Sequence, residues 1–271
     1  MLMVALRSHA ARRSMCVMAL GLALVIGACG GNPPTTDTDD GDAAKASQEA
    51  EASVDEIDDF FKAVAESDID GLRTASSELA APDSFAAGYA THLANVTEAD
   101  LDAGYSTEPS EYRKSSKGYQ TCGVDLDGEE VCTEYTDLET QGGKLAAFSV
   151  NGTPLKERLT LGDGSSVNAG ELAAIELLSA YKSGRGDLFV VMKIDSRGEE
   201  VSPYVNGATY RAPSGRQSTA SSDSSYIDGL APDSSATMYA VFPRAEVGGE
   251  VSLTVATTED FEESTAKIKI K

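Results

Sequence analysis

The apolar residues of this chain recur with a helical period near its start and with a strand period from Gly118 onward. This switch constrains the fold more than any other feature of the sequence, because each period specifies which residues share a face. A Ser53–Glu56 capping pair opens the helical part. The apolar residues that follow it stand at i, i+3, i+4 and i+7 and predict an amphipathic helix: Ile57, Phe60, Phe61 and Val64.

Two further helices are expected before the strands begin. Asp68 is placed to cap the second, which Pro82 stops. The third runs from about Ser84 to Asn95, and the helical period brings four of its side chains together on its surface: Phe85, Tyr89, His92 and Leu93.

A short apolar run near the beginning indicates where the chain resides. Three arginines precede an uncharged stretch over residues 15–28, which is too short to cross a bilayer, since a spanning helix needs about 20 residues. The arrangement is typical of an export signal. The alternatives are a membrane anchor that happens to contain Cys29 and a cleavage site without lipid.

The residues "IGAC", 26–29, resemble the lipobox of bacterial lipoproteins, in particular those of actinobacteria. The resemblance implies that residues 1–28 are a signal peptide cleaved after Ala28 and that Cys29 carries a diacylglycerol. The chain would then be anchored to the cell membrane on its extracytoplasmic face. Residues 29–53 are polar and acidic, so we expect a disordered tether between the lipid and the folded part.

The acidic composition limits the partners. The chain has 22 Lys and Arg against 44 Asp and Glu, a formal charge of −22. Removal of residues 1–28 takes away three Arg and no acidic residue, which leaves −25. Such a charge repels phosphate groups, so we expect no nucleic acid partner.

The two cysteines that remain after export and lipidation are expected to form a disulfide. In "CGVDLDGEEVC", a three-residue loop with Gly128 in the left-handed conformation places Cys122 opposite Cys132 in a hairpin. A redox-active pair is the alternative, although the spacing is not that of a C-x-x-C motif.

The change of period within residues 54–153 predicts an α+β domain, with three helices followed by antiparallel hairpins. Its segments "FFKAVAESDIDGLRTASSELAAP" and "YTDLETQGGKLAAFSVNG" resemble the cone-shaped, cystatin-like domains of the nuclear transport factor 2 superfamily. The resemblance implies a cone of helices and sheet with room for a ligand inside. Phe61, Tyr89 and His92 are the residues expected to line such a pocket.

Residues 155–271 are expected to form a second, all-β domain. Short β-rich runs separated by Gly, Pro, Asp and Ser clusters fit a two-sheet sandwich. The segments "DLFVVMKIDSRGEE" and "GLAPDSSATMYAVFPRA" resemble immunoglobulin-like domains of secreted and lipid-anchored bacterial proteins. The Gly and Pro break at "NGTPL" predicts that the two domains fold independently.

Few residues suit catalysis. His92 is the only histidine after residue 28, and the sequence lacks a G-x-S-x-G nucleophile elbow. Ser179 and Lys182 match S-x-x-K, but in an expected strand and without the accompanying motifs. Arg185, Gly186 and Asp187 form the tripeptide known for integrin recognition in cell adhesion. Because it lies between two expected strands, we expect it to form a turn. We therefore predict no enzyme activity, no cofactor and no metal site.

Two hypotheses for the function follow. The first is a non-catalytic, membrane-anchored surface lipoprotein that binds an envelope protein or a cell-wall component. The second is a small-ligand carrier or sensor that uses a pocket in residues 54–153. A filled domain interior favours the first, and an open pocket with convergent polar groups favours the second.

Overall fold

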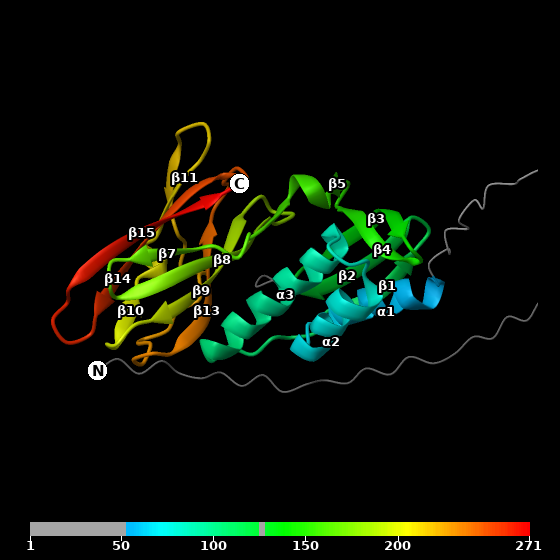
Figure 1. Cartoon of the computed structure of the whole chain (residues 1–271). Helices are drawn as coiled ribbons and strands as arrows, with labels where there is room; N and C mark the ends of the chain where they lie inside the picture. Colours follow the sequence, from blue (N-terminus) through cyan, green and yellow to red (C-terminus); the bar gives the residue numbers. More distant parts are fainter. Residues whose placement is uncertain (1–52, 125–127) are drawn as a thin grey trace, which may run out of the picture. The chain divides into compact units, whose positions relative to one another are not determined.

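A computed structural model describes residues 53–124 and 128–271 of the chain (Figure 1). The expected signal peptide, the lipobox with Cys29 and all of the expected tether except Ser53 lie outside the described residues. The described chain is mostly antiparallel β-sheet, with few α-helices, all of them before the first strand. It belongs to one compact unit.

Helices α1 and α2 begin at the caps that the sequence predicts. In α1, Val54–Glu66, the Ser53 hydroxyl accepts a hydrogen bond from the Glu56 backbone N–H. In α2, Ile69–Thr74, the Asp68 carboxylate accepts from the Gly71 N–H at 3.0 Å. A π-helical turn, η1, continues it over Ala75–Leu79 and ends before Pro82.

The helices cover one face of a five-stranded antiparallel sheet (Figure 1). We call this part, residues 53–154, the helical lobe. The strands follow one another in chain order, and the tight β3–β4 turn uses Gly142 and Gly143 at positive φ. The strands are β1 Glu111–Ser115, β2 Gly118–Val124, β3 Glu130–Gln141, β4 Lys144–Val150 and β5 Thr153–Pro154.

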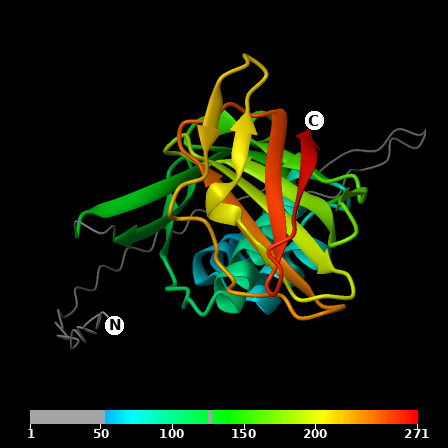
Figure 2. The same ribbon diagram turned by 90° about the vertical axis from the view of Figure 1, so that its left-hand side faces the viewer.

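The remaining residues form a two-sheet antiparallel sandwich, which Figure 2 turns toward the viewer. One sheet has the order β13-β9-β8-β6, with β7 also paired to β8. Its strands are β6 Leu159–Leu161, β7 Ser166–Ala169, β8 Ala173–Lys182, β9 Leu188–Ser196 and β13 Ser235–Phe242.

The second sheet is built around β14, which pairs with β10 and β11 on one side and with β15 on the other. Its strands are β10 Val201–Pro203, β11 Thr209–Arg211, β12 Gln217–Thr219, β14 Gly249–Thr257 and β15 Glu263–Ile270. One apolar core joins the two sheets, with Met192, Tyr210 and Met238 among its fully buried members.

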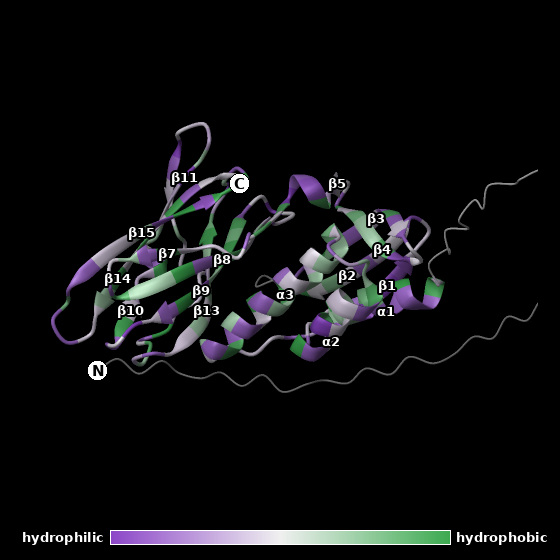
Figure 3. Cartoon of the chain, in the orientation of Figure 1, coloured by the Kyte–Doolittle hydropathy of each residue, from purple (hydrophilic) through white to green (hydrophobic). Residues whose placement is uncertain are grey.

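Strand β8 is hydrophobic over much of its length (Figure 3). Short 3-10 turns, η2 at Leu155–Glu157 and η3 at Val205–Gly207, complete the described elements.

Helix α3 is longer than the sequence predicts. It begins at Phe85, next to the expected start, with Ser84 as its cap, but extends to Asp102 rather than ending near Asn95. The additional turns lie on the sandwich, where Ala99 packs with Val191, Tyr239 and Val241 in a small core of their own. This contact, which local propensity cannot anticipate, offsets the weak helix propensity of the Asn-Val-Thr segment.

Residues from the second expected domain also pack into the first. Leu155, the last residue of "NGTPL", belongs to the core of the helical lobe, as do Leu159 and Tyr181, which follow it in the chain. Burial of these side chains depends on α3 and β4, and burial of Ala99 depends on β9 and β13. Residues on both sides of the expected boundary therefore share buried clusters.

Candidate functional site

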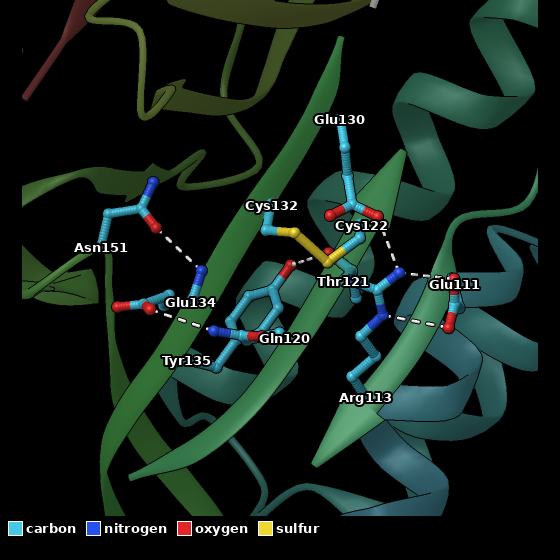
Figure 4. The surroundings of a disulfide bond; sticks show 10 residues. All are labelled: Glu111, Arg113, Gln120, Thr121, Cys122, Glu130, Cys132, Glu134, Tyr135 and Asn151. Carbon is cyan, nitrogen blue, oxygen red and sulfur yellow. Dashed lines mark hydrogen bonds and ion pairs between the residues drawn. A yellow bond between two sulfur atoms is a disulfide. The ribbon is translucent and has the colours of Figure 1, made fainter. Parts of the chain in front are cut away.

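The two cysteines face each other across a hairpin, as the sequence predicts. Cys122 on β2 is the direct partner of Cys132 on β3, and a disulfide joins them (Figure 4). Gly128 has a φ of +83°, the left-handed conformation expected at the hairpin loop, while residues 125–127 lie outside the described chain. The pair therefore closes a short local loop.

Charged side chains surround this disulfide (Figure 4). The Arg113 guanidinium donates to Glu111 at 2.7 Å and to Glu130 at 2.7 Å, which raises the pKa of Arg113 above its usual value and lowers the pKa of both carboxyls. Gln120 donates to Glu134 across the strands at 3.0 Å. These cross-strand pairs hold the solvent-facing side of the sheet in register.

Two of the three expected pocket residues fill an aromatic core. Phe61 is fully buried, with its ring centroid 4.6 Å from that of Tyr119 and 4.9 Å from that of Tyr135. Tyr89 is also buried, and its ring lies 5.4 Å from the rings of Phe148 and Tyr181. These side chains pack against one another, so neither faces an open ligand pocket in this conformation.

The third residue, His92, lies where α3 meets the sandwich. Its Nδ1 is 2.8 Å from the Ser179 hydroxyl on β8, and its ring lies 5.2 Å from that of Tyr181. His92 is 2% exposed and Ser179 is 1% exposed. Burial lowers the pKa of His92 to about 3, so the imidazole is neutral at pH 7.

The His92–Ser179 pair has the residue types of a base and a nucleophile but not the access that a reaction needs. A candidate nucleophile must lie within reach of a substrate atom, whereas both side chains here are enclosed between α3 and β8. The pair is a polar contact between the helical lobe and the sandwich. The sequence identified Ser179 only through S-x-x-K, where Lys182 was its expected companion.

The adhesion tripeptide forms the turn between β8 and β9. The Gly186 N–H donates to the Ser183 carbonyl at 3.0 Å, and the Asp187 carboxylate accepts from the Arg244 backbone N–H at 3.1 Å. Asp187 therefore anchors the turn to the end of β13, as expected for a residue with a structural role.

The helical lobe contains a buried carboxylate that was not predicted from the sequence. Asp58 of α1 is 7% exposed, accepts a hydrogen bond from the Tyr119 hydroxyl at 2.8 Å and forms an ion pair with Lys114. Burial raises the pKa of Asp58, but its contacts with Lys114 and Tyr119 outweigh this effect and hold the pKa below its usual value. The sequence signal for its burial is the helical spacing, because Asp58 stands three residues before Phe61 and so shares the apolar face of α1.

A second missed contact joins the lobes. The Tyr239 hydroxyl on β13 donates to the Asp100 carboxylate on α3 at 2.7 Å. Partial burial raises the pKa of Asp100, and the hydrogen bond from Tyr239 opposes that rise. Asp100 lies in the part of α3 that the sequence did not predict to be helical.

Acidic residues gather at one end of the sandwich. A groove of about 330 Å³ there is lined by Gly198, Glu199, Glu200, Pro232, Thr257, Thr258, Glu259 and Asp260. Within the described ranges, no group of three or more His, Cys, Asp and Glu side chains is arranged to hold a metal ion. The same part of the chain contains no helix that is both long and apolar enough to span a membrane.

Comparison with known proteins yields weak structural similarities. No family model matches the sequence, and the search of curated proteins finds no match. The yjhA protein from Bacillus subtilis is 11% identical, with a TM-score of 0.28 over 40% of this chain and 97% of its own. The yeast GGA1 GAE domain is 13% identical, with a TM-score of 0.28 over 39% and 97% of the two chains. The GAE domain of GGA2p from Saccharomyces cerevisiae is also 13% identical, with a TM-score of 0.24 over 40% and 96%.

Proposed function

We propose that this chain is a non-catalytic bacterial lipoprotein, anchored through Cys29 to the extracytoplasmic face of the cell membrane. In this proposal the helical lobe is a cone-shaped domain, and the sandwich is of the immunoglobulin-like type. The basic start, the short apolar run and the sequence "IGAC" support the anchor. Two long acyl chains would hold the protein on the membrane, because each buried methylene contributes about 0.8 kcal/mol.

The packing around Phe61 favours a partner bound at the protein surface over a ligand bound inside the helical lobe. Phe61 and Tyr89 fill the space that a ligand would occupy in a hollow cone. The enclosed, neutral imidazole of His92 also supports the non-catalytic proposal, since a general base needs contact with its substrate.

The proposed partner is an envelope protein with a basic surface. The net charge of −25 after cleavage of residues 1–28 and the acidic groove at the end of the sandwich provide charge complementarity to such a surface. A cell-wall component is the alternative partner. Nucleic acid is disfavoured by the same charge, because phosphate groups would be repelled.

One observation favours the second function, a small-ligand carrier. A cavity of about 280 Å³ opens in the helical lobe beside β4, and apolar and charged side chains line it together. It lies near the expected pocket but uses other residues, chiefly Phe85, Asp137, Glu139, Phe148 and Leu155. The volume is close to the lower end of the range of small-molecule sites.

Two measurements test the leading proposal. Cells that express the chain should incorporate labelled fatty acid into it, and Cys29→Ser should abolish that label while Cys16→Ser leaves it unchanged. Purified Cys29→Ser protein, which lacks the lipid, should sediment with isolated cell envelopes, and this binding should weaken when Glu199 and Glu200 are both changed to Gln. Equal labelling of the Cys29→Ser protein would exclude the anchor, and unchanged sedimentation would exclude the acidic end as the binding surface.

A further inference from the structure

A cavity of about 390 Å³ lies at one edge of the sandwich, away from the residues discussed above. The edge is formed by β6, β7 and β8 of one sheet and by β15 of the other, which is the outermost strand beside β14. Strand β15 lies near both β7 and β8. The cavity is therefore the place where the two sheets separate and the sandwich interior meets solvent.

The floor of this edge cavity is apolar. Ile175 and Leu177 on β8 and Ile268 on β15 are at most 8% exposed and belong to the sandwich core. Leu161 lies at the cavity with 45% of its surface exposed. A volume of this size is within the range of small-ligand sites, and apolar walls of this kind bind an alkyl or aryl group.

The backbone beside the cavity is closely packed. A Cβ atom on Gly162 would overlap the Leu177 carbonyl oxygen, and the Gly162 N–H donates to the Leu178 carbonyl at 3.0 Å. The segment between β6 and β7 is therefore held against β8. A preformed wall lowers the ordering cost of binding.

Lysines from β15 and its end line the same cavity. Lys267, Lys269 and Lys271 alternate with the buried residues Ile268 and Ile270. In a chain of charge −22, three cations at one apolar opening are a local exception. They favour an anion there through both Coulomb attraction and direct hydrogen bonding.

Two of these lysines have acidic partners. Lys271 lies 3.2 Å from Asp163, and Lys267 lies 3.9 Å from Glu250. Across residues 53–124 and 128–271, no ion pair involves Lys269. Lys269 is therefore the cation most available to a ligand head group.

We propose that the edge cavity binds an amphipathic anion, with its alkyl part on Ile175, Leu177 and Ile268 and its anionic head at Lys269. Lysines on an edge strand also discourage pairing with other strands. That role explains the charges but not the apolar cavity beside them, whereas an amphipathic anion accounts for both. The inference goes beyond the proposed function and does not depend on lipid at Cys29.

Binding of matched ten-carbon ligands to the full chain tests the charge requirement. Decanoate should bind more tightly than decyltrimethylammonium, which presents the same alkyl length with a positive head. The affinity for decanoate should fall with added salt, while that for decanol should not. Decyl phosphate distinguishes a phosphate from a carboxylate preference. Equal affinities for decanoate and decyltrimethylammonium would overturn the proposal.

Two variants locate the site. Lys269→Glu should weaken decanoate binding about tenfold, as expected for the loss and reversal of an exposed charge pair. Leu161→Glu should weaken it as well, because it adds an anion at the cavity. Lys117→Glu, the same charge change at an exposed turn of the helical lobe, is the matched control and should bind like the wild type.

A photoreactive alkyl carboxylate provides a readout that is independent of affinity. Cross-linking should label peptides that contain residues 161–177 or 267–271, and decanoate should compete with it. Labelling that remains unchanged in both Lys269→Glu and Leu161→Glu, or that maps to other residues, would refute the edge cavity as the site. If the apolar residues 15–28 bound the probe instead, the label would map to those residues and would not change in the two variants.

Discussion

Acidification should destabilise this protein through His92. The folded-state pKa is about 3 and the usual value is 6.5, so the unfolded chain binds the proton more readily. The stability that comes from the neutral imidazole is complete above pH 6.5 and is lost progressively as the pH falls toward 3. Each pH unit in that window corresponds to about 1.4 kcal/mol. Between pH 7 and pH 4.5 the expected loss is therefore about 2.5 kcal/mol of unfolding free energy.

Urea unfolding at both pH values measures this loss. Tyrosine fluorescence can follow the transition, since the chain has 10 Tyr and no Trp. The carboxylates also titrate, so the informative quantity is the difference between the wild type and His92→Gln, which cannot gain a proton. The wild type should lose about 2.5 kcal/mol more than the variant on acidification.

Ser179→Ala is the control for this prediction. It removes the hydrogen-bond partner of His92 but leaves the imidazole in its enclosed position, so it should keep the pH dependence of the wild type. Equal losses in the wild type and in His92→Gln, within about 0.5 kcal/mol, would refute the reasoning from burial.

Three further predictions concern the contacts that hold the fold together. Reduction of the Cys122–Cys132 disulfide should lower the unfolding free energy by about 2.5 to 3 kcal/mol on the chain-entropy model, and the Cys122→Ser, Cys132→Ser double variant should match the reduced protein in urea unfolding. Tyr239→Phe should lower the unfolding free energy by about 1.5 to 3 kcal/mol in urea unfolding, because Asp100 loses its hydrogen-bond donor. The control Tyr226→Phe removes an exposed hydroxyl from Asp228 and should change the unfolding free energy by less than about 0.5 kcal/mol. Residues 54–153 expressed alone should melt without a cooperative transition, since Leu155, Leu159 and Tyr181 are missing from their core. A sharp calorimetric transition would instead support the sequence-based expectation of independent domains.

Local signals in the sequence were sufficient for much of the fold. Ser53, Asp68 and Ser84 cap helices where their side chains can accept backbone hydrogen bonds. The strand-rich segments quoted above contain β9 and β13, and the hairpin register places Cys122 opposite Cys132. All of these features depend on residues close together in the chain.

The features that sequence analysis missed depend on distant residues. The last turns of α3 are stabilised by Val191, Tyr239 and Val241, which lie far along the chain. The packing around the expected pocket residues depends on distant parts of the chain as well. Helical spacing places Tyr89 and His92 on a common side of α3, but whether that side is open depends on Phe148, Tyr181 and Ser179.

The long reach of the α3 contacts has a consequence for the order of folding. The Asp100–Tyr239 hydrogen bond closes a separation of 139 residues, and the His92–Ser179 bond closes one of 87. Contacts of such separation form late, because the chain between them must first lose its freedom. A chain made from its N-terminus would therefore complete α3 only after β13 has joined the sandwich. Until then, the apolar side of Val96 and Ala99 would remain open to water and to other unfinished chains.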